Sequence, residues 1–128
     1  MKNVLVFLGC GCGGLARYWL ASLMTTIFGR SFPFGTLFVN VSGSLIMGVL
    51  FTLTFTHFRH SHPFWLSFAL LGFLGGYTTF STFSIETIEL IRIGSIQVAV
   101  YNIILSVILC LSATWLGVMI ANYLLKQI

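Results

Sequence analysis

The stretch GFLGGYTTFSTFSIE, residues 72–86, gathers glycines, hydroxyl side chains and one of only two acidic residues in a chain that is otherwise mostly hydrocarbon. Its three glycines are followed by a tyrosine and two threonines, and none of these residues favours a helix. The stretch therefore predicts an interruption of a helix. Carbonyl groups released there are natural ligands for a small cation, and a helix that restarts at a serine or threonine cap directs its positive dipole end at an anion.

The composition of the whole chain indicates that this interruption lies inside a membrane. The chain has 128 residues, room for one domain, of which 58% are hydrophobic and 6% charged. Its mean hydropathy of +1.05 falls outside the range of water-soluble domains. The net charge is +4, but the basic residues are scattered and form no cluster that could bind phosphates, so no nucleic-acid partner is expected.

Four apolar segments are long enough to cross a membrane, since about 20 helical residues span about 30 Å of hydrocarbon. Helices are expected at residues 4–27, 35–56, 64–92 and 96–125, separated by short turns that contain glycine or proline. The sequence thus predicts an all-α integral membrane protein, a single four-helix transmembrane domain over residues 1–128. Its third helix is expected to be broken near mid-membrane.

The charges in the connecting loops predict no preferred orientation. Four spans place both chain ends and the second loop on one side, and the basic residues divide almost evenly: Lys2, Arg59 and Lys126 against Arg30 and Arg92. Arg17 lies inside the first helix or near its end. Because lysine and arginine in short loops set topology, the near tie predicts insertion in both directions and permits an antiparallel pair of copies.

Polar side chains recur every four residues on two of the predicted helices and therefore share one face of each. The second helix carries such a stripe at Thr36, Asn40 and Ser44, with Gly48 at the next position of the same face, and the fourth carries one at Asn102, Ser106 and Cys110. The amide of Asn40 needs hydrogen-bond partners in hydrocarbon. Two interpretations stay open for it: it joins neighbouring helices, or it belongs to a polar pathway.

Phe80 and Phe83 lie three residues apart on one helix face, with Ser81, Thr82 and Ser84 beside them. The rings can simply pack in a core. Alternatively, their edges, which carry partial positive charge, can flank a small anion without trapping it.

Two other motifs are assigned structural roles. Residues 9–14, GCGCGG, match a dinucleotide-binding pattern, but no acidic residue follows at the required distance. Gly9 and Gly13 are instead expected to let another helix approach closely. The pattern H-x-x-H-x-H at His57, His60 and His62 lacks further metal ligands and is interpreted as a solvated loop.

The cysteines Cys10, Cys12 and Cys110 are odd in number and lie in apolar segments, so a disulfide framework is not expected. All three are predicted to be small buried residues.

Three stretches together resemble the signature motifs of the Fluc (CrcB) fluoride channels. They are GCGGLARYWL (11–20), GTLFVNVSGSLIMG (35–48) and GFLGGYTTFSTFSIE (72–86), in the family's order and spacing. The resemblance implies a multi-pass protein of the cell inner membrane that lets fluoride leave the cytoplasm and so protects the cell. It also implies an antiparallel, dual-topology homodimer with two pores and a structural sodium ion at its centre.

Residue roles follow from the same resemblance. The fluoride pathway would comprise Asn40, Phe80, Ser81, Thr82, Phe83, Glu86, Asn102, Ser106 and Cys110. Backbone carbonyls of Gly75 and Thr78 would bind the sodium ion, and Arg17 would be structural, together with Gly9 and Gly13. Cys110 departs from the Tyr or Ser common in relatives, and a thiol donates a weaker hydrogen bond.

Two rivals from other classes stay open. A proton-coupled exporter of drugs or small cations can also be a four-helix dual-topology dimer. Such an exporter would require a carboxylate deep in the first helix, and residues 4–27 contain none. An assembly subunit would use the polar residues only to join helices. An enzyme is not expected, because no nucleophile and base pair or metal-ligand set is visible.

Overall fold

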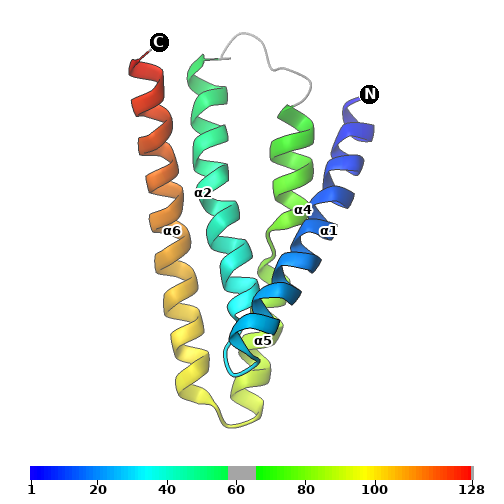
Figure 1. The fold of residues 1–128 in the computed structure, drawn as a ribbon, viewed down its shortest axis with the longest axis vertical. Helices are drawn as coiled ribbons and strands as arrows, with labels where there is room; N and C mark the ends of the chain where they lie inside the picture. Colours follow the sequence, from blue (N-terminus) through cyan, green and yellow to red (C-terminus); the bar gives the residue numbers. More distant parts are fainter. Residues whose placement is uncertain (58–65, 128) are drawn as a thin grey trace.

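Within the residues that the structure describes, 1–57 and 66–127 of a computed structural model, four helical spans are long and apolar enough to cross a membrane (Figure 1). They are α1 (Lys2–Phe28), α2 (Phe34–His57), a third span (Ser67–Arg92) and α6 (Ile96–Lys126). The third span contains the π-helix η1 (Ser67–Leu74), the short α4 (Gly75–Tyr77) and α5 (Phe80–Arg92). The predicted all-helical architecture with four spans is confirmed.

Several expectations fall on residues 58–65, which lie outside the described residues. They concern Arg59, the histidines His60 and His62, and the first two residues of the third predicted helix.

Glycines end two of the helices and reverse the chain. Gly29 follows α1 and Gly94 follows α5, each with a φ of 81°, a conformation that favours glycine over residues with a Cβ. The chain then turns back, so α2 runs against α1 and α6 runs against α5 (Figure 1). Both chain ends therefore lie at the same end of the bundle.

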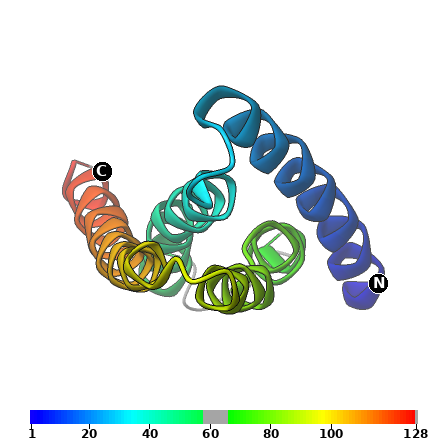
Figure 2. The same cartoon turned by 90° about the horizontal axis from the view of Figure 1, so that it is seen from below.

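The helices pack closely where small residues meet backbone. α2 makes its most extensive contact with α6, and α1 and α6 lie on opposite sides of the molecule (Figure 2). Gly48 of α2 faces the carbonyl group of Thr114, and Gly117 of α6 faces that of Leu45, so a Cβ at either glycine would collide with backbone. Such close approach is how helices gain packing energy in lipid, where burial of apolar surface drives nothing.

Gly9 and Gly13 bring α1 against the third span in the same way. Both are buried, and a Cβ on Gly9 would meet the backbone of Gly72, while one on Gly13 would meet the backbone of Phe73 and Tyr77. The inward face of α1 is therefore its glycine face.

Cys10 and Cys12 lie beside this glycine face and are exposed on the single chain. The prediction that they are buried was wrong, because the outward face of a membrane helix is as apolar as the inward one. Cys110 is partly buried, and all three cysteines are free thiols.

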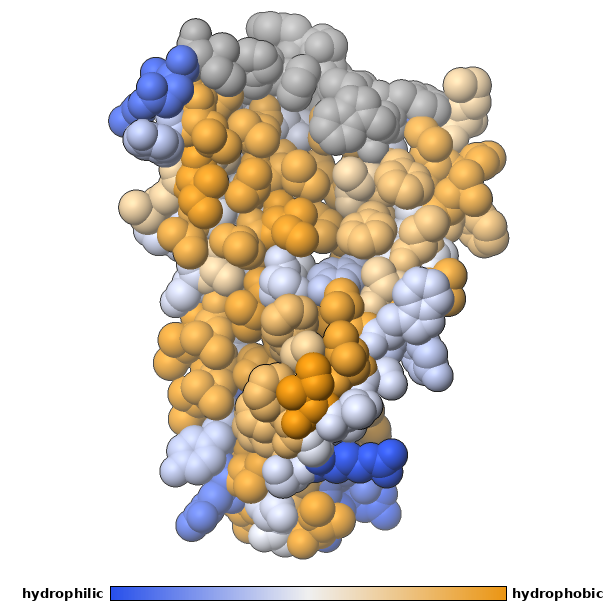
Figure 3. Space-filling model, in the orientation of Figure 1, coloured by the Kyte–Doolittle hydropathy of each residue, from blue (hydrophilic) through white to orange (hydrophobic). Residues whose placement is uncertain are grey.

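The exterior of the bundle is apolar. Among the described residues, Val39, Leu74 and Tyr77 form one buried cluster at the core, whereas large hydrophobic side chains are exposed on all four spans. On the face drawn in Figure 3, hydrophobic residues predominate over the middle and strongly hydrophilic ones gather near the two ends. A surface of this kind suits lipid and not water. The chain is a multi-pass membrane protein.

Candidate functional site

The backbone leaves the helical conformation at two residues of the third span. Thr78 has φ and ψ of −80° and 157°, and Thr79 has −153° and 120°, so both are extended between α4 and α5. Thr79 then caps α5, because its hydroxyl oxygen accepts a hydrogen bond from the Thr82 N–H at 3.2 Å. The first turn of α5 thus begins at Phe80 with one of its amides satisfied by a side chain.

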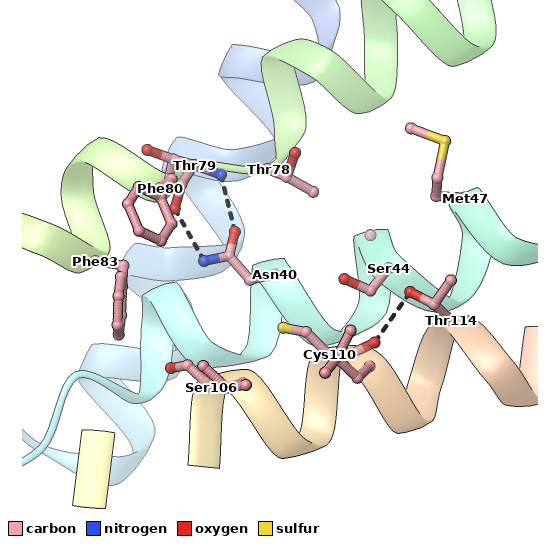
Figure 4. Close-up of a pocket in the computed structure, with 13 residues that line it drawn as sticks. Asn40, Ser44, Met47, Thr78, Thr79, Phe80, Phe83, Ser106, Cys110 and Thr114 are labelled. Atoms are coloured by element: carbon pink, nitrogen blue, oxygen red, sulfur yellow. Dashed lines mark hydrogen bonds between the residues drawn. The ribbon is translucent and has the colours of Figure 1, made fainter. Parts of the chain in front are cut away.

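Asn40 of α2 holds this interruption from the side (Figure 4). Its Nδ2 donates to the Thr79 carbonyl oxygen at 2.9 Å, and its Oδ1 accepts from the Thr79 N–H at 2.8 Å. One amide side chain therefore satisfies both backbone groups of an extended residue. One N–H of Asn40 is left over for another acceptor.

The interruption releases several backbone carbonyls from their helical partners, among them those of Gly75 and Thr78. In a continuous helix the Gly75 carbonyl would accept from the Thr79 N–H, which instead donates to Asn40. The Thr78 carbonyl would accept from the Thr82 N–H, which instead donates to the Thr79 hydroxyl. The resemblance to the Fluc family implied a sodium ion at these two carbonyls, and unwound carbonyls are suitable ligands for sodium.

Arg17 reaches the same place from α1. Its Nη1 donates to the Thr78 carbonyl oxygen at 3.4 Å. A charged side chain inside a membrane span needs a partner, and the released carbonyl is the one that the structure gives it.

A cavity of about 420 Å³ opens beside the interruption, between α2, the start of α5 and α6 (Figure 4). It brings together five of the residues predicted for the ion pathway, namely Asn40, Phe80, Phe83, Ser106 and Cys110. Thr78, one of the two residues predicted to hold sodium, lies at the same cavity.

Phe80 and Phe83 form one wall of this cavity. Their ring centroids are 5.3 Å apart and the ring planes are tilted by 46°. Phe83 is 9% exposed and fixed in the bundle, whereas Phe80 is 77% exposed on the single chain. The pair therefore presents one immobilised ring to the cavity and one ring whose surface lacks a neighbour in this chain.

The other predicted residues lie outside the cavity. Ser81 and Thr82 cluster around the Thr79 hydroxyl, at 3.2 Å and 3.0 Å. Asn102 is 1% exposed, and its Nδ2 donates to the hydroxyl of Thr87 on α5 at 2.9 Å.

Glu86 faces a second cavity of about 350 Å³, which Arg30 and Glu89 also line. Thr36 donates to one of its carboxylate oxygens at 2.9 Å. The other carboxylate oxygen is buried and has no hydrogen-bond partner within the described residues. This position is separate from the cavity at Asn40.

Sequence reasoning missed several residues of the site. Thr114 and Met47 line the cavity, and Thr87 and Tyr77 hold its surroundings through hydrogen bonds to Asn102 and Ser42. Thr114 continues the four-residue spacing of the stripe on α6 and could have been found by extending it. Thr87 carries no signal of this kind, because its partner is fixed only by how α5 and α6 pack.

The described part of the chain contains no cluster of side chains that would form an alternative, metal-binding site. Residues 1–57 and 66–127 hold no group of three or more His, Cys, Asp or Glu side chains placed to share a metal ion.

Fold and site together define a small polytopic membrane protein whose interrupted span borders a largely apolar cavity that a few polar side chains also line. The family model described as "CrcB-like protein, Camphor Resistance (CrcB)" matches residues 4–118, and the chain belongs to this family.

Relatives match along nearly the whole chain. A protein of Coxiella burnetii (strain CbuK_Q154) named "Fluoride-specific ion channel FluC" is 52% identical over 124 residues, covering 97% of this chain and all of the relative. Proteins of the same name from Methylococcus capsulatus and Pelobacter propionicus are 46% and 43% identical, covering 93% and 98% of this chain. The match covers 52% of the Methylococcus protein and 98% of the Pelobacter one.

Proposed function

We propose that this protein is a fluoride-selective ion channel of the cell inner membrane, through which fluoride leaves the cytoplasm passively and so does less harm to the cell. The names of the relatives support the ion, and the cavity at the interrupted span supports the path. The observation that carries the proposal is the meeting of one free Asn40 N–H, two tilted phenyl rings and the hydroxyl of Ser106 at one cavity.

The chemistry of this cavity suits a small anion. Fluoride gives up its water only where compact donors replace it, and an amide N–H and a hydroxyl are such donors. The phenyl edges add weak positive potential. No lysine or arginine is among the residues that line the cavity, so the ion meets no full charge that would hold it, and entry stays compatible with release.

The proposal includes a structural sodium ion at the released carbonyls of Gly75 and Thr78. Hard cations take more oxygen ligands than two, about six in the case of calcium, so a second copy of the chain would have to contribute equivalent carbonyls. Gly75 supports this, because it is exposed on the single chain with open space around it. A two-fold axis through this point would place the broken part of the third span near mid-membrane.

The exposed ring of Phe80 supports the same assembly. At 77% exposure it is a poor wall for a pore in one chain alone. A second, antiparallel copy would cover it, and the two-fold relation would then produce two equivalent pores.

Fluoride flux from liposomes tests the channel. Purified protein is reconstituted with internal potassium fluoride, a voltage is set with valinomycin, and fluoride release is followed with an electrode. We expect release without a pH gradient, much slower release of chloride, and loss of release in Phe80→Ile. Phe51→Ile is the matched control, since Phe51 is an exposed ring on α2 that is not among the residues lining the cavity. A strict requirement for a proton gradient would instead support a proton-coupled exporter.

A further inference from the structure

A chain of three buried hydrogen bonds ties α6 to α5 next to the cavity. The Ser106 hydroxyl donates to Asn102 Oδ1 at 3.5 Å, Asn102 Nδ2 donates to Thr87 Oγ1 at 2.9 Å, and Thr87 Oγ1 donates to the Phe83 carbonyl oxygen at 2.7 Å. Asn102 is the most deeply buried polar residue of the three, at 1% exposed. The chain begins at a residue that lines the cavity and ends at the backbone of one of its aromatic rings.

The direction of donation in this chain is fixed by the number of hydrogens. The Thr87 hydroxyl has one hydrogen, which goes to the Phe83 carbonyl, so this oxygen can only accept from Asn102. Asn102 must therefore turn its NH₂ group toward α5 and its carbonyl oxygen toward Ser106. One orientation of the amide satisfies the whole chain.

The bonds shorten along the chain from the cavity to the ring. The bond at Ser106 is long and weak, while those at Thr87 are short. An anion in the cavity can therefore take the Ser106 hydroxyl without releasing Asn102 from Thr87. The link between the helices stays closed whether or not the cavity holds an ion.

We infer that Asn102 and Thr87 are positioning residues, which hold the turn of α5 that carries Phe83 at a fixed distance from α6. The effect of this positioning on transport rests on the proposed function, since Phe83 lines the proposed pore. Asn102 then acts through Thr87 and not by touching the ion. α5 packs against α6 much less extensively than α2 does, so few other contacts can replace this link.

The position of the ring can be measured without any transport. Phe83 is replaced by 4-fluorophenylalanine, and the ¹⁹F resonance of the reconstituted protein is compared among Thr87→Val, Thr87→Ser and Thr54→Val. Thr54 is the matched control: it is buried at 3% exposed and makes the same bond to its own helix, from Oγ1 to the Leu50 carbonyl, but within residues 1–57 and 66–127 no bond to another helix.

We expect the ¹⁹F resonance to shift or broaden in Thr87→Val, to return in Thr87→Ser, and to stay at its wild-type position in Thr54→Val. Fluoride release should fall several-fold in Thr87→Val alone. An unchanged resonance in Thr87→Val, or one that Thr87→Ser does not restore, would overturn the positioning role even if the wild-type protein carries fluoride. If the resonance shifts in Thr87→Val and returns in Thr87→Ser, but the wild-type protein releases no fluoride, the positioning role stands and the channel is refuted.

Discussion

At the scale of single residues, the Asn40 amide both binds the backbone of the interrupted span and lines the cavity. Its carbonyl oxygen and one N–H are bound to the backbone of Thr79, which leaves the second N–H for another acceptor, and Asn40 also lines the cavity. The stripe of polar residues left two interpretations open, a helix-joining role or a pathway role. The hydrogen-bond inventory makes these compatible, since an amide has enough groups for both.

Removing this amide should damage the site and the fold together. In Asn40→Ala the N–H and carbonyl of Thr79 lose their partners, and each buried group left unsatisfied costs about 1–3 kcal/mol. We expect a lower melting temperature in detergent and fluoride release below one tenth of the wild-type rate. Calorimetry or fluorescence-monitored melting measures the first and the liposome assay the second.

Thr52→Val is the control on the same helix. In the described part of the chain its hydroxyl bonds only the Gly48 carbonyl of its own helix, at 2.8 Å, so this change should leave melting and flux close to wild type. If Asn40→Ala melts like Thr52→Val, the amide does not support the interruption in the way that its two bonds indicate.

Residue spacing predicted much of the site, but not its partners. The four-residue repeats on α2 and α6 correctly place Asn40, Ser106 and Cys110 where a shared face can meet, and all three line one cavity. That Asn102 would turn to Thr87 could not be predicted, because a side chain's partner depends on the rotation of two helices about their axes. The motif similarity names residues, whereas packing decides which of them touch the cavity.

At the scale of elements, the third span joins three backbone conformations in one crossing. η1 is a π-helix, α4 and α5 are α-helical, and two extended residues separate them. Glycines and threonines predicted the loss of regular helix, but nothing in SFALLGFL distinguishes a π-helix from an α-helix. The π-helical turns lie against α1, where Gly9 and Gly72 let two backbones meet.

This contact predicts opposite effects for neighbouring glycines of α1. In Gly13→Ala the new Cβ meets the backbone of Phe73 and Tyr77, which cannot move aside as a side chain can. Overpacking of this kind typically costs about 1–3 kcal/mol, so the melting temperature should fall. In Gly11→Ala the Cβ meets nothing within 4 Å, and the better helix propensity of alanine should add up to about 1 kcal/mol.

The melting temperatures of the two variants, measured in the same detergent, test whether α1 packs on the third span through its glycine face. Equal melting temperatures for Gly13→Ala and Gly11→Ala would mean that α1 does not rest on the third span through its glycine face.

At the scale of the whole molecule, the surface of one chain is apolar on every span. The large apolar residues exposed there can face lipid, and in the proposed antiparallel pair a second copy would also cover Gly75 and the ring of Phe80. Both lie at the interruption of the third span, which is where an antiparallel copy would meet this one. Such a copy requires that the same chain insert in both directions.

The distribution of charge makes insertion in both directions the expected outcome. Both chain ends lie at one end of the bundle, with Lys2 and Lys126 there and Arg30 and Arg92 in or beside the turns at the other. With a chain whose native cysteines are replaced by serine, Gln127→Cys reports the side on which the exposed C-terminus lies. In intact spheroplasts we expect a membrane-impermeant maleimide to label about half of the molecules, because the lysine and arginine bias that selects one orientation is close to zero.

Fixing the orientation then tests whether function needs both. Three lysines added after the C-terminus should hold the C-terminus in the cytoplasm. Three lysines added to the turn at Arg30 should hold that turn in the cytoplasm and so keep the C-terminus outside. Each fixed variant alone can form no antiparallel pair and should release no fluoride, whereas their co-expression should restore release, since only the mixture contains both orientations. A fixed variant that conducts alone would contradict the antiparallel pair, and it would require the cavity of a single chain or of a parallel dimer to carry the ion.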